Sequence, residues 1–181
     1  MRPSIERNVL IALTGTPGTG KTSVGKVLEA RGYVVLDLDQ VARGYGLIRG
    51  RDEARQADEV DVDALRERIW VPAKLAFLKS HYSHFMDVNM AIVFRCRPAV
   101  LRDRLRARQW SEEKISENIE AEAIDVITQE ATQRIPFVYE VDTTARLPTE
   151  TAEQILAILQ GKTKGHEPGG VDWTSEVLSW Y

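Results

Sequence analysis

An apolar segment, a glycine-rich loop and a helical pattern follow one another near the start of the chain. Val9–Leu13 has the composition of a buried strand, and Val24 and Leu28 fall on one face of the helical pattern after the loop. The loop, residues 15–22, reads Gly-Thr-Pro-Gly-Thr-Gly-Lys-Thr, a complete G-x-x-x-x-G-K-[ST] pattern. Strand, loop and helix therefore come in the order that a phosphate-binding loop requires.

Each residue type in this loop suits contact with phosphate. Glycines let the backbone turn tightly and approach an anion, so that successive N–H groups and the helix N-terminus face it. We expect Lys21 to reach the β- and γ-phosphates of a nucleoside triphosphate and the Thr22 hydroxyl to bind Mg²⁺. The loop residues expected to hold the nucleotide are Gly15, Gly18, Thr19, Gly20, Lys21, Thr22 and Ser23.

Composition narrows the class of protein. A chain of 181 residues suits one domain with a sizeable core, and a net charge of −3 gives no overall attraction to nucleic acid or to a membrane. The single cysteine, Cys96, cannot form an internal disulfide, and neither a signal peptide nor a run of eighteen apolar residues is present. We therefore expect a cytoplasmic protein without a membrane partner.

Strand-like and helix-like segments alternate along the rest of the chain, which predicts an α/β fold with a doubly wound five-stranded parallel sheet of the P-loop NTPase class. The expected later strands are Tyr33–Leu38, Ala73–Leu78, Ala91–Arg95 and Phe137–Asp142. The expected later helices are Val62–Ile69 (stopped by Pro72), Pro98–Gln109, a helix capped by Ser111 that reaches Ala123, and Glu150–Leu159. Open sheets of this kind bind ligands beyond the carboxyl ends of their strands, where Asp37 and Asp39 stand.

Two segments lack apolar periodicity. Val41–Asp61 is rich in glycine and charge, so we expect an excursion over the nucleotide site, with Arg43 available to a phosphate group. From Lys162 onward, glycines and prolines predict a loose tail, whose aromatic end docks on its own domain more readily than on a partner. The aromatic residues of that end are Trp173, Trp180 and Tyr181.

Six arginines lie between residues 95 and 108. Arg104 and Arg108 are four apart and would share a helix face, so both are expected to grip phosphate oxygens. Arg102 and Arg106 are expected to face solvent. A monophosphate acceptor is ionised at neutral pH and needs no general base, whereas hydrolysis or transfer to a hydroxyl needs a group that orients the nucleophile. His81 is the candidate for that role, and a structural, hydrogen-bonded histidine is the alternative.

Taken together, these residues resemble the adenylate-kinase-like ribosome-assembly factors of archaea and of the eukaryotic nucleus, the adenylate kinase isoenzyme six family. Besides the phosphate loop and His81, the resemblance is carried by Val41–Arg43 and by the runs Arg104–Glu122 and Tyr139–Thr144, and it covers about residues 8–160. The sequence Gly-Gly-Val-Asp-Trp that ends at Trp173 is similar to archaeal members.

The resemblance implies an adenylate kinase, tolerant of several nucleoside monophosphates, that uses ATP and Mg²⁺ and also has ATPase activity. It implies a role in maturation of the small ribosomal subunit, including 16S rRNA processing, through transient contact with the pre-ribosome and with universal small-subunit protein eleven. Residues 37–60 would form the monophosphate-binding region, 107–117 a lid and 162–181 a C-terminal tail. The residues it implies for catalysis are Lys21, Arg104, Arg108 and His81, with Arg108 also on ATP and with Asp37, Asp39 and Arg43 on the acceptor.

Lys79 departs from the family pattern, in which an acidic residue stands two positions before the histidine. A carboxylate there would organise water around magnesium, so Lys79 puts the position of the metal in doubt, unless Asp37 or Asp39 compensates. Two other functions stay open from the sequence. One is an assembly ATPase with weak or no kinase activity, and the other is a different small kinase of this fold, such as a cytidylate kinase.

Overall fold

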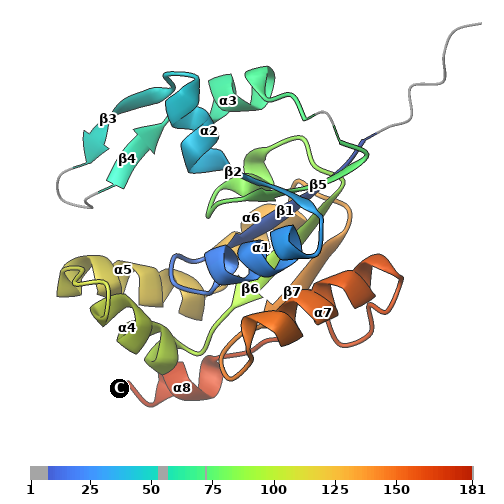
Figure 1. Cartoon of the computed structure of the whole chain (residues 1–181). Coiled ribbons are helices and arrows are strands. Elements are labelled where there is room, and N and C mark those ends of the chain that lie inside the picture. The colour runs from blue at the N-terminus through green and yellow to red at the C-terminus, as the bar shows by residue number, and fades with distance from the viewer. Residues whose placement is uncertain (1–7, 53–56, 72, 181) are drawn as a thin grey trace, which may run out of the picture.

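The computed structural model describes residues 8–52, 57–71 and 73–180 (Figure 1). Its centre is a sheet with strand order β2-β5-β1-β6-β7, in which every neighbouring pair is parallel. The strands of this sheet are β1 (Val9–Gly15), β2 (Val34–Asp37), β5 (Leu75–Lys79), β6 (Met90–Arg95) and β7 (Val138–Asp142). The predicted five-stranded parallel sheet of a P-loop NTPase is thereby confirmed.

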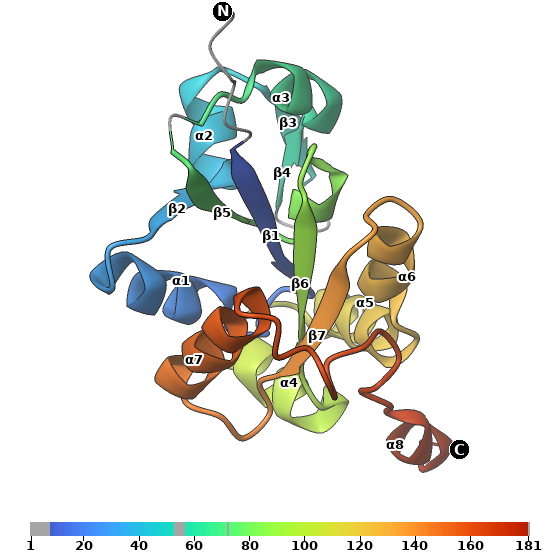
Figure 2. The same ribbon diagram turned by 90° about the vertical axis from the view of Figure 1, so that its right-hand side faces the viewer.

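Helices cover both faces of this sheet. Figure 2 shows α1 and α7 together on one side and α6 on the other. The helices are α1 (Lys21–Ala30), α2 (Leu38–Gly44), α3 (Val62–Arg68), α4 (Pro98–Arg106), α5 (Glu112–Ala123), α6 (Val126–Thr132), α7 (Pro148–Leu159) and α8 (Thr174–Leu178), with a short 3-10 turn, η1 (Ser83–Phe85).

The alternation of side chains along β1 divides the core into two layers. Ile11 and Leu13 are fully buried in the layer beneath α1 and α7, whereas Ala12 points the other way, into the layer beneath α6. Burial of each large apolar side chain stabilises the fold by roughly 1.5–3 kcal/mol. A separate cluster that includes Leu101, Leu105, Ile115 and Ile119 packs α4 against α5 and so fixes the helix that forms one side of the site.

Strand β1 lies where the order of the strands reverses, because the chain places β5 and β2 on one side of it and β6 and β7 on the other. Open α/β sheets bind ligands at such a switch point, beyond the carboxyl ends of the strands. The loop after β1 lies there. Lys79 pairs in register with both Leu13 and Asp37, so the carboxyl ends of β1, β5 and β2 meet beside this loop.

The segment expected as an irregular excursion contains regular structure. Strand β2 ends at Asp37 because that carboxylate caps α2, accepting hydrogen bonds from the N–H groups of Asp39 and Gln40. An antiparallel hairpin of β3 (Ile48–Asp52) and β4 (Ala57–Val60) follows. These elements are too short for a hydrophobic period to be visible in the sequence.

Three boundaries also differ from the sequence prediction. Helix α4 ends at Arg106 rather than Gln109, which has a left-handed backbone with φ of 58°. Asp125, also at φ 58°, separates α5 from α6, a helix that the sequence pattern did not predict. Helix α3 ends at Arg68, and Pro72, the predicted stop, lies outside the described residues.

The C-terminal segment is held more firmly than a loose tail. The backbone N–H groups of Gly169 and Val171 donate to Glu140 Oε2, and the Trp173 indole donates to Glu122 Oε1 at 3.2 Å. Docking on its own domain is thus confirmed for Trp173, while Trp180 is 42% exposed and Tyr181 lies outside the described residues. Among the residues described, no helix is long and apolar enough to cross a membrane.

Candidate active site

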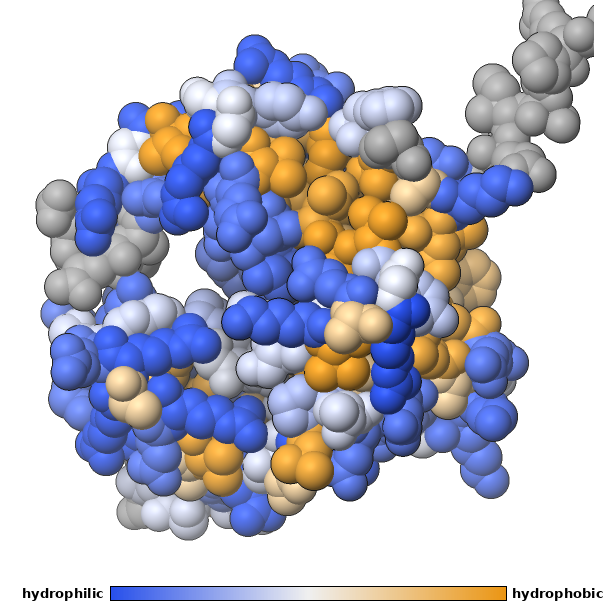
Figure 3. Space-filling model, in the orientation of Figure 1, coloured by the Kyte–Doolittle hydropathy of each residue, from blue (hydrophilic) through white to orange (hydrophobic). Residues whose placement is uncertain are grey.

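A cleft of about 710 Å³ opens between the α2 and β3–β4 segment on one side and α5 with the turn before it on the other. Figure 3 shows it as a hollow rimmed largely by hydrophilic residues. A second hollow of about 180 Å³ lies over the phosphate-binding loop. The two adjoin, because they share lining residues: Pro17, Asp39, His81 and Arg108.

Packing, as well as phosphate contact, requires glycine in the loop. Gly15 has φ of 131°, and a Cβ there would lie 2.5 Å from the backbone oxygen of Phe94 on β6. At Gly18, with φ of 93°, a Cβ would lie 2.8 Å from Leu105 on α4. A side chain at either position is therefore excluded by both the backbone conformation and the neighbouring strand or helix.

The Lys21 side chain folds back onto the earlier residues of its own loop. Its ammonium donates to the backbone oxygens of Gly15 at 2.5 Å and Thr16 at 3.0 Å, and the side chain is buried. Burial, together with the positive charges of Arg108 and Lys79, lowers the pKa of Lys21 to about 7, although Glu122 opposes the shift. A phosphate anion beside this ammonium would restore its preference for the charged form.

The predicted magnesium ligand has a cation beside it. The Lys79 ammonium donates to the Thr22 hydroxyl at 3.3 Å and to Asp37 Oδ2 at 2.5 Å. The Thr22 hydroxyl and one Asp37 oxygen thus contact Lys79, and the other Asp37 oxygen caps α2. Within the described part of the chain, no three His, Cys, Asp or Glu side chains are grouped to hold a metal ion. As arranged, these residues do not fit Mg²⁺.

His81 lines both hollows, as its sequence position suggested. Loss of solvation within the cleft, followed by the charge of Lys21, lowers the pKa of His81 to about 4. The ring is therefore neutral at pH 7 and can orient a hydrogen-bonding group without adding positive charge. His84 instead is buried between Thr14 and Glu130, and His166 bonds the backbone oxygen of Glu140, so both are structural.

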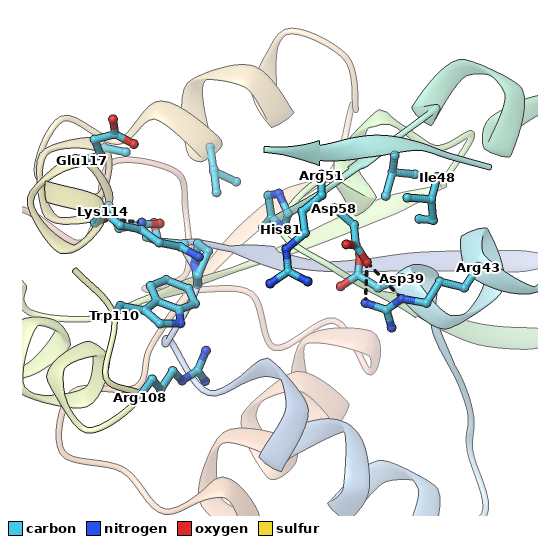
Figure 4. Close-up of a pocket in the computed structure, with 16 residues that line it drawn as sticks. Asp39, Arg43, Ile48, Arg51, Asp58, His81, Arg108, Trp110, Lys114 and Glu117 are labelled. Atoms are coloured by element: carbon cyan, nitrogen blue, oxygen red, sulfur yellow. Dashed lines mark hydrogen bonds and ion pairs between the residues drawn. The ribbon is translucent and has the colours of Figure 1, made fainter. Parts of the chain in front are cut away.

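Exposed ion pairs build the side of the cleft formed by α2, β3 and β4. Arg43 donates to Asp58 Oδ2 through Nε at 3.2 Å and a terminal nitrogen at 3.0 Å. Arg51, which the sequence did not single out, points from β3 into the middle of the cleft (Figure 4). Asp39 accepts a 2.8 Å hydrogen bond from the Tyr82 hydroxyl, which turns this carboxylate toward the cleft floor.

The opposite side of the cleft carries two cations that lie over an aromatic ring. The Lys114 ammonium lies 3.6 Å from the centroid of the Trp110 ring, and the Arg108 guanidinium carbon lies 5.7 Å from it (Figure 4). Burial, followed by the charge of Arg51, lowers the pKa of Lys114. Sequence reasoning missed Trp110 and Lys114, although their position within the predicted lid was a usable signal.

Arg104 does not join this cleft, which corrects the prediction that it and Arg108 share a helix face toward phosphate. Its guanidinium donates to the backbone oxygens of Thr143 at 2.8 Å and Thr144 at 3.2 Å. Because α4 ends at Arg106, Arg108 lies in the following turn and the helical spacing no longer applies. Arg102 and Arg106 lie toward solvent, as predicted, and both pair there with Glu112.

A buried charged network supports the loop from behind. Arg95, 1% exposed, donates to the carboxylates of Glu122, Glu140 and Asp125. The Thr16 hydroxyl donates to the second Glu122 oxygen at 2.7 Å, so the phosphate-binding loop is tied directly to this network. The sequence did not reveal it, because its members lie far apart along the chain.

Comparison with known proteins gives two kinds of similarity. Residues 11–125 match the family described as "AAA domain". A protein of Archaeoglobus fulgidus, named "Putative adenylate kinase", is 45% identical over 172 residues, covering 93% of this chain and 94% of its own. One of Methanothermobacter thermautotrophicus with the same name is 41% identical, covering 93% and 99%.

Solved structures share the fold at low identity. A shikimate kinase from Acinetobacter baumannii in complex with shikimate has a TM-score of 0.59 and 15% identity, covering 89% of this chain and 98% of its own. A gluconokinase from Sinorhizobium meliloti 1021 has a TM-score of 0.53 and 16% identity, covering 87% and 94%. At this level of identity the likeness concerns the arrangement of the elements.

Proposed function

This chain belongs to the AAA domain family and is similar to archaeal proteins named "Putative adenylate kinase", and from this premise we propose that it is a nucleoside monophosphate kinase that transfers the γ-phosphoryl group of ATP to AMP. The observation that carries the proposal is the pair of adjoining hollows. One lies over a phosphate-binding loop and the other between two walls that each carry cationic side chains, so two phosphate-bearing molecules can meet at their shared boundary.

The donor nucleotide would occupy the hollow over the loop. Gly18, Gly20 and the N-terminus of α1 border that hollow and suit the triphosphate, as do the side chains of Lys21, Thr22 and Ser23, which line it. Arg108 lines both hollows, so its guanidinium can contact the phosphoryl group between donor and acceptor. Lys21 and Arg108 would together offset the charge that develops during transfer.

The acceptor would occupy the larger cleft, with residues 37–60 as its binding region. Arg43 and Arg51 line that cleft and supply guanidinium groups for the monophosphate, and Asp39 lies at the boundary with the donor hollow. An acceptor phosphate oxygen attacks the γ-phosphorus while the bond from that phosphorus to the β,γ-bridging oxygen breaks, giving two molecules of ADP. No proton has to move, which agrees with a His81 whose lowered pKa makes it a weak base and leaves it to orient groups.

Residues 107–117 would act as the lid. They contain Arg108, Trp110 and Lys114, which face the cleft from one side, and the left-handed Gln109 between two helices provides a natural bending point. Closure would bring these groups over the donor and exclude water, which favours transfer over hydrolysis. The predicted ATPase activity, the Mg²⁺ requirement and the contact with a small-subunit ribosomal protein stay predictions.

Phosphorus NMR of nucleotide turnover tests the proposal. The purified protein receives ATP and Mg²⁺ first alone and then with AMP, and separate runs replace AMP by CMP, GMP or UMP. We expect two ADP for each AMP consumed and little inorganic phosphate without AMP. Lys26→Met, on the exposed face of α1, is the matched control for Lys21→Met. If no acceptor is converted to its diphosphate, the result contradicts the kinase, and phosphate release from ATP alone favours the ATPase.

A further inference from the structure

Lys79 is placed by three elements at the edge of the donor hollow. It is the last residue of β5, in register with Asp37 on β2 and Leu13 on β1. Its side chain crosses α1 where that helix has a glycine: a Cβ at Gly25 would lie 3.5 Å from Lys79 Cδ. The stem of the lysine is therefore packed along a fixed path, and its ammonium reaches the first turn of α1.

The ammonium itself is held in position. It lies 2.5 Å from Asp37 Oδ2 and 3.3 Å from the Thr22 hydroxyl, and the Lys79 side chain is only 13% exposed. Asp37 cannot swing away freely, because its other oxygen caps α2. Of the three N–H donors on a lysine ammonium, two meet these acceptors, and the third remains for the hollow that Lys79 lines.

Three cations, Lys21, Lys79 and Arg108, line this hollow of about 180 Å³ together with two carboxylates, Asp37 and Asp39, so that the cations are in excess. Their mutual repulsion is felt in the free protein, since Arg108 and Lys79 both lower the pKa of Lys21. A concave space lined by an excess of positive charge attracts an anion. In the proposed kinase that anion is the triphosphate.

We propose that Lys79 is a built-in cation of the triphosphate site, which contacts β- or γ-phosphate oxygens beside Thr22 and lets the protein bind metal-free ATP nearly as tightly as its magnesium complex. The inference rests on the proposed function only in taking a nucleoside triphosphate as the ligand of this hollow. The inference is drawn from the position of the Lys79 ammonium, which contacts the Thr22 hydroxyl that a divalent ion would otherwise use.

Isothermal titration calorimetry of the whole chain tests this without any turnover. ATP and AMP are each titrated in excess EDTA and again in Mg²⁺, with AMP included because it lacks the β- and γ-phosphates. The variants are Lys79→Met, Lys79→Asp and Asp37→Asn, with Lys26→Met as a control that removes the same charge from an exposed position. Circular dichroism and thermal melting check the fold of each variant.

For the wild-type protein and Lys26→Met, we expect ATP affinity to differ by less than about fivefold between EDTA and Mg²⁺. A charge-assisted contact to phosphate predicts that Lys79→Met loses roughly tenfold or more of its ATP affinity in EDTA, with AMP affinity unchanged. Lys79→Asp should bind ATP measurably only with Mg²⁺. Asp37→Asn keeps a capping oxygen but frees the ammonium, so metal-free ATP affinity should rise about two- to fivefold.

Two results would overturn the inference: wild-type ATP affinity that falls more than about tenfold in EDTA, or a folded Lys79→Met that binds metal-free ATP as the wild type does. If Lys79→Met does not fold, Asp37→Asn decides, because a purely structural Lys79–Asp37 pair predicts unchanged or weaker ATP binding in that variant. These binding results are independent of phosphoryl transfer, so a failure of the kinase proposal in the NMR experiment is seen separately.

Discussion

The two sides of the cleft are held by ion pairs of opposite kinds. Behind the phosphate-binding loop, Arg95 and its carboxylate partners Glu122 and Glu140 are at most 3% exposed, and Glu122 also bonds the loop at Thr16. Across the cleft, Arg43 pairs with Asp58 while 58% of its side chain is exposed. The donor side is thus fixed from behind, whereas the acceptor side is held by contacts that an incoming phosphate can replace.

This difference suits a phosphoryl-transfer site. A donor side that is fixed in advance needs no reorganisation when the charge of the transition state develops. An acceptor side with exposed pairs can exchange a carboxylate partner for a phosphate at little cost, because such pairs contribute only about 0–1 kcal/mol. Four predictions test this difference, in decreasing order of the change that we expect.

Arg95→Met should have the largest effect. It leaves the buried carboxylates of Glu122 and Glu140 without their cation, which is expected to lower the free energy of unfolding by about 3–5 kcal/mol. Urea denaturation measures it, with Arg43→Met as the matched control on the exposed side. A loss below about 1 kcal/mol for Arg95→Met would show that the two sides do not differ in this way.

Lys21→Met should abolish turnover while sparing the fold. Loss of a cation on the transferred group is expected to reduce kcat/KM by roughly 100-fold or more. Because burial disfavours the charged form of Lys21 in the folded protein, removal of this group should leave the melting temperature unchanged or raise it below pH 7. A melting temperature that falls by several degrees would instead assign Lys21 a mainly structural role.

ATP affinity should depend on pH through Lys21. Its pKa in the free protein is about 7, and a bound triphosphate should raise that pKa, so binding takes up a proton above pH 7. Affinity should then fall by up to about tenfold per pH unit between pH 7.5 and 9. Calorimetry in two buffers of different ionisation enthalpy measures the proton uptake directly. Equal heats in both buffers, or the same pH profile in Lys21→Met, would contradict this assignment.

Arg51→Met should give the smallest and most selective change. Loss of one guanidinium from the acceptor side is expected to raise KM for AMP about three- to tenfold, with KM for ATP and the melting temperature nearly unchanged. Arg49→Met is the neighbouring control, since Arg49 pairs with Asp61 and does not line the cleft. A larger change in KM for ATP than for AMP would place Arg51 on the donor side.

The phosphate-binding loop and the parallel sheet could be predicted because their signals are local: glycine spacing, apolar runs and alternation. The network behind the loop could not, since Arg95 and Glu122 are 27 residues apart and no short pattern joins them. The prediction that Arg104 and Arg108 share a helix face was wrong because the end of α4 at Arg106 carries no strong stop signal. Lys79 shows the opposite case: its departure from the pattern of the family that the sequence resembles marked a residue that contacts Thr22, the predicted magnesium ligand.

The most direct measurement uses a bisubstrate analogue, two adenosines joined by a chain of five phosphates. If the cleft holds donor and acceptor together on its two different sides, calorimetry should give one molecule per chain, bound at least about 100-fold more tightly than ATP. The analogue should also displace both ATP and AMP and change the fluorescence of Trp110, with Trp110→Phe identifying that signal. Binding of two molecules per chain, or displacement of ATP without displacement of AMP, would contradict a single cleft with two nucleotide sites.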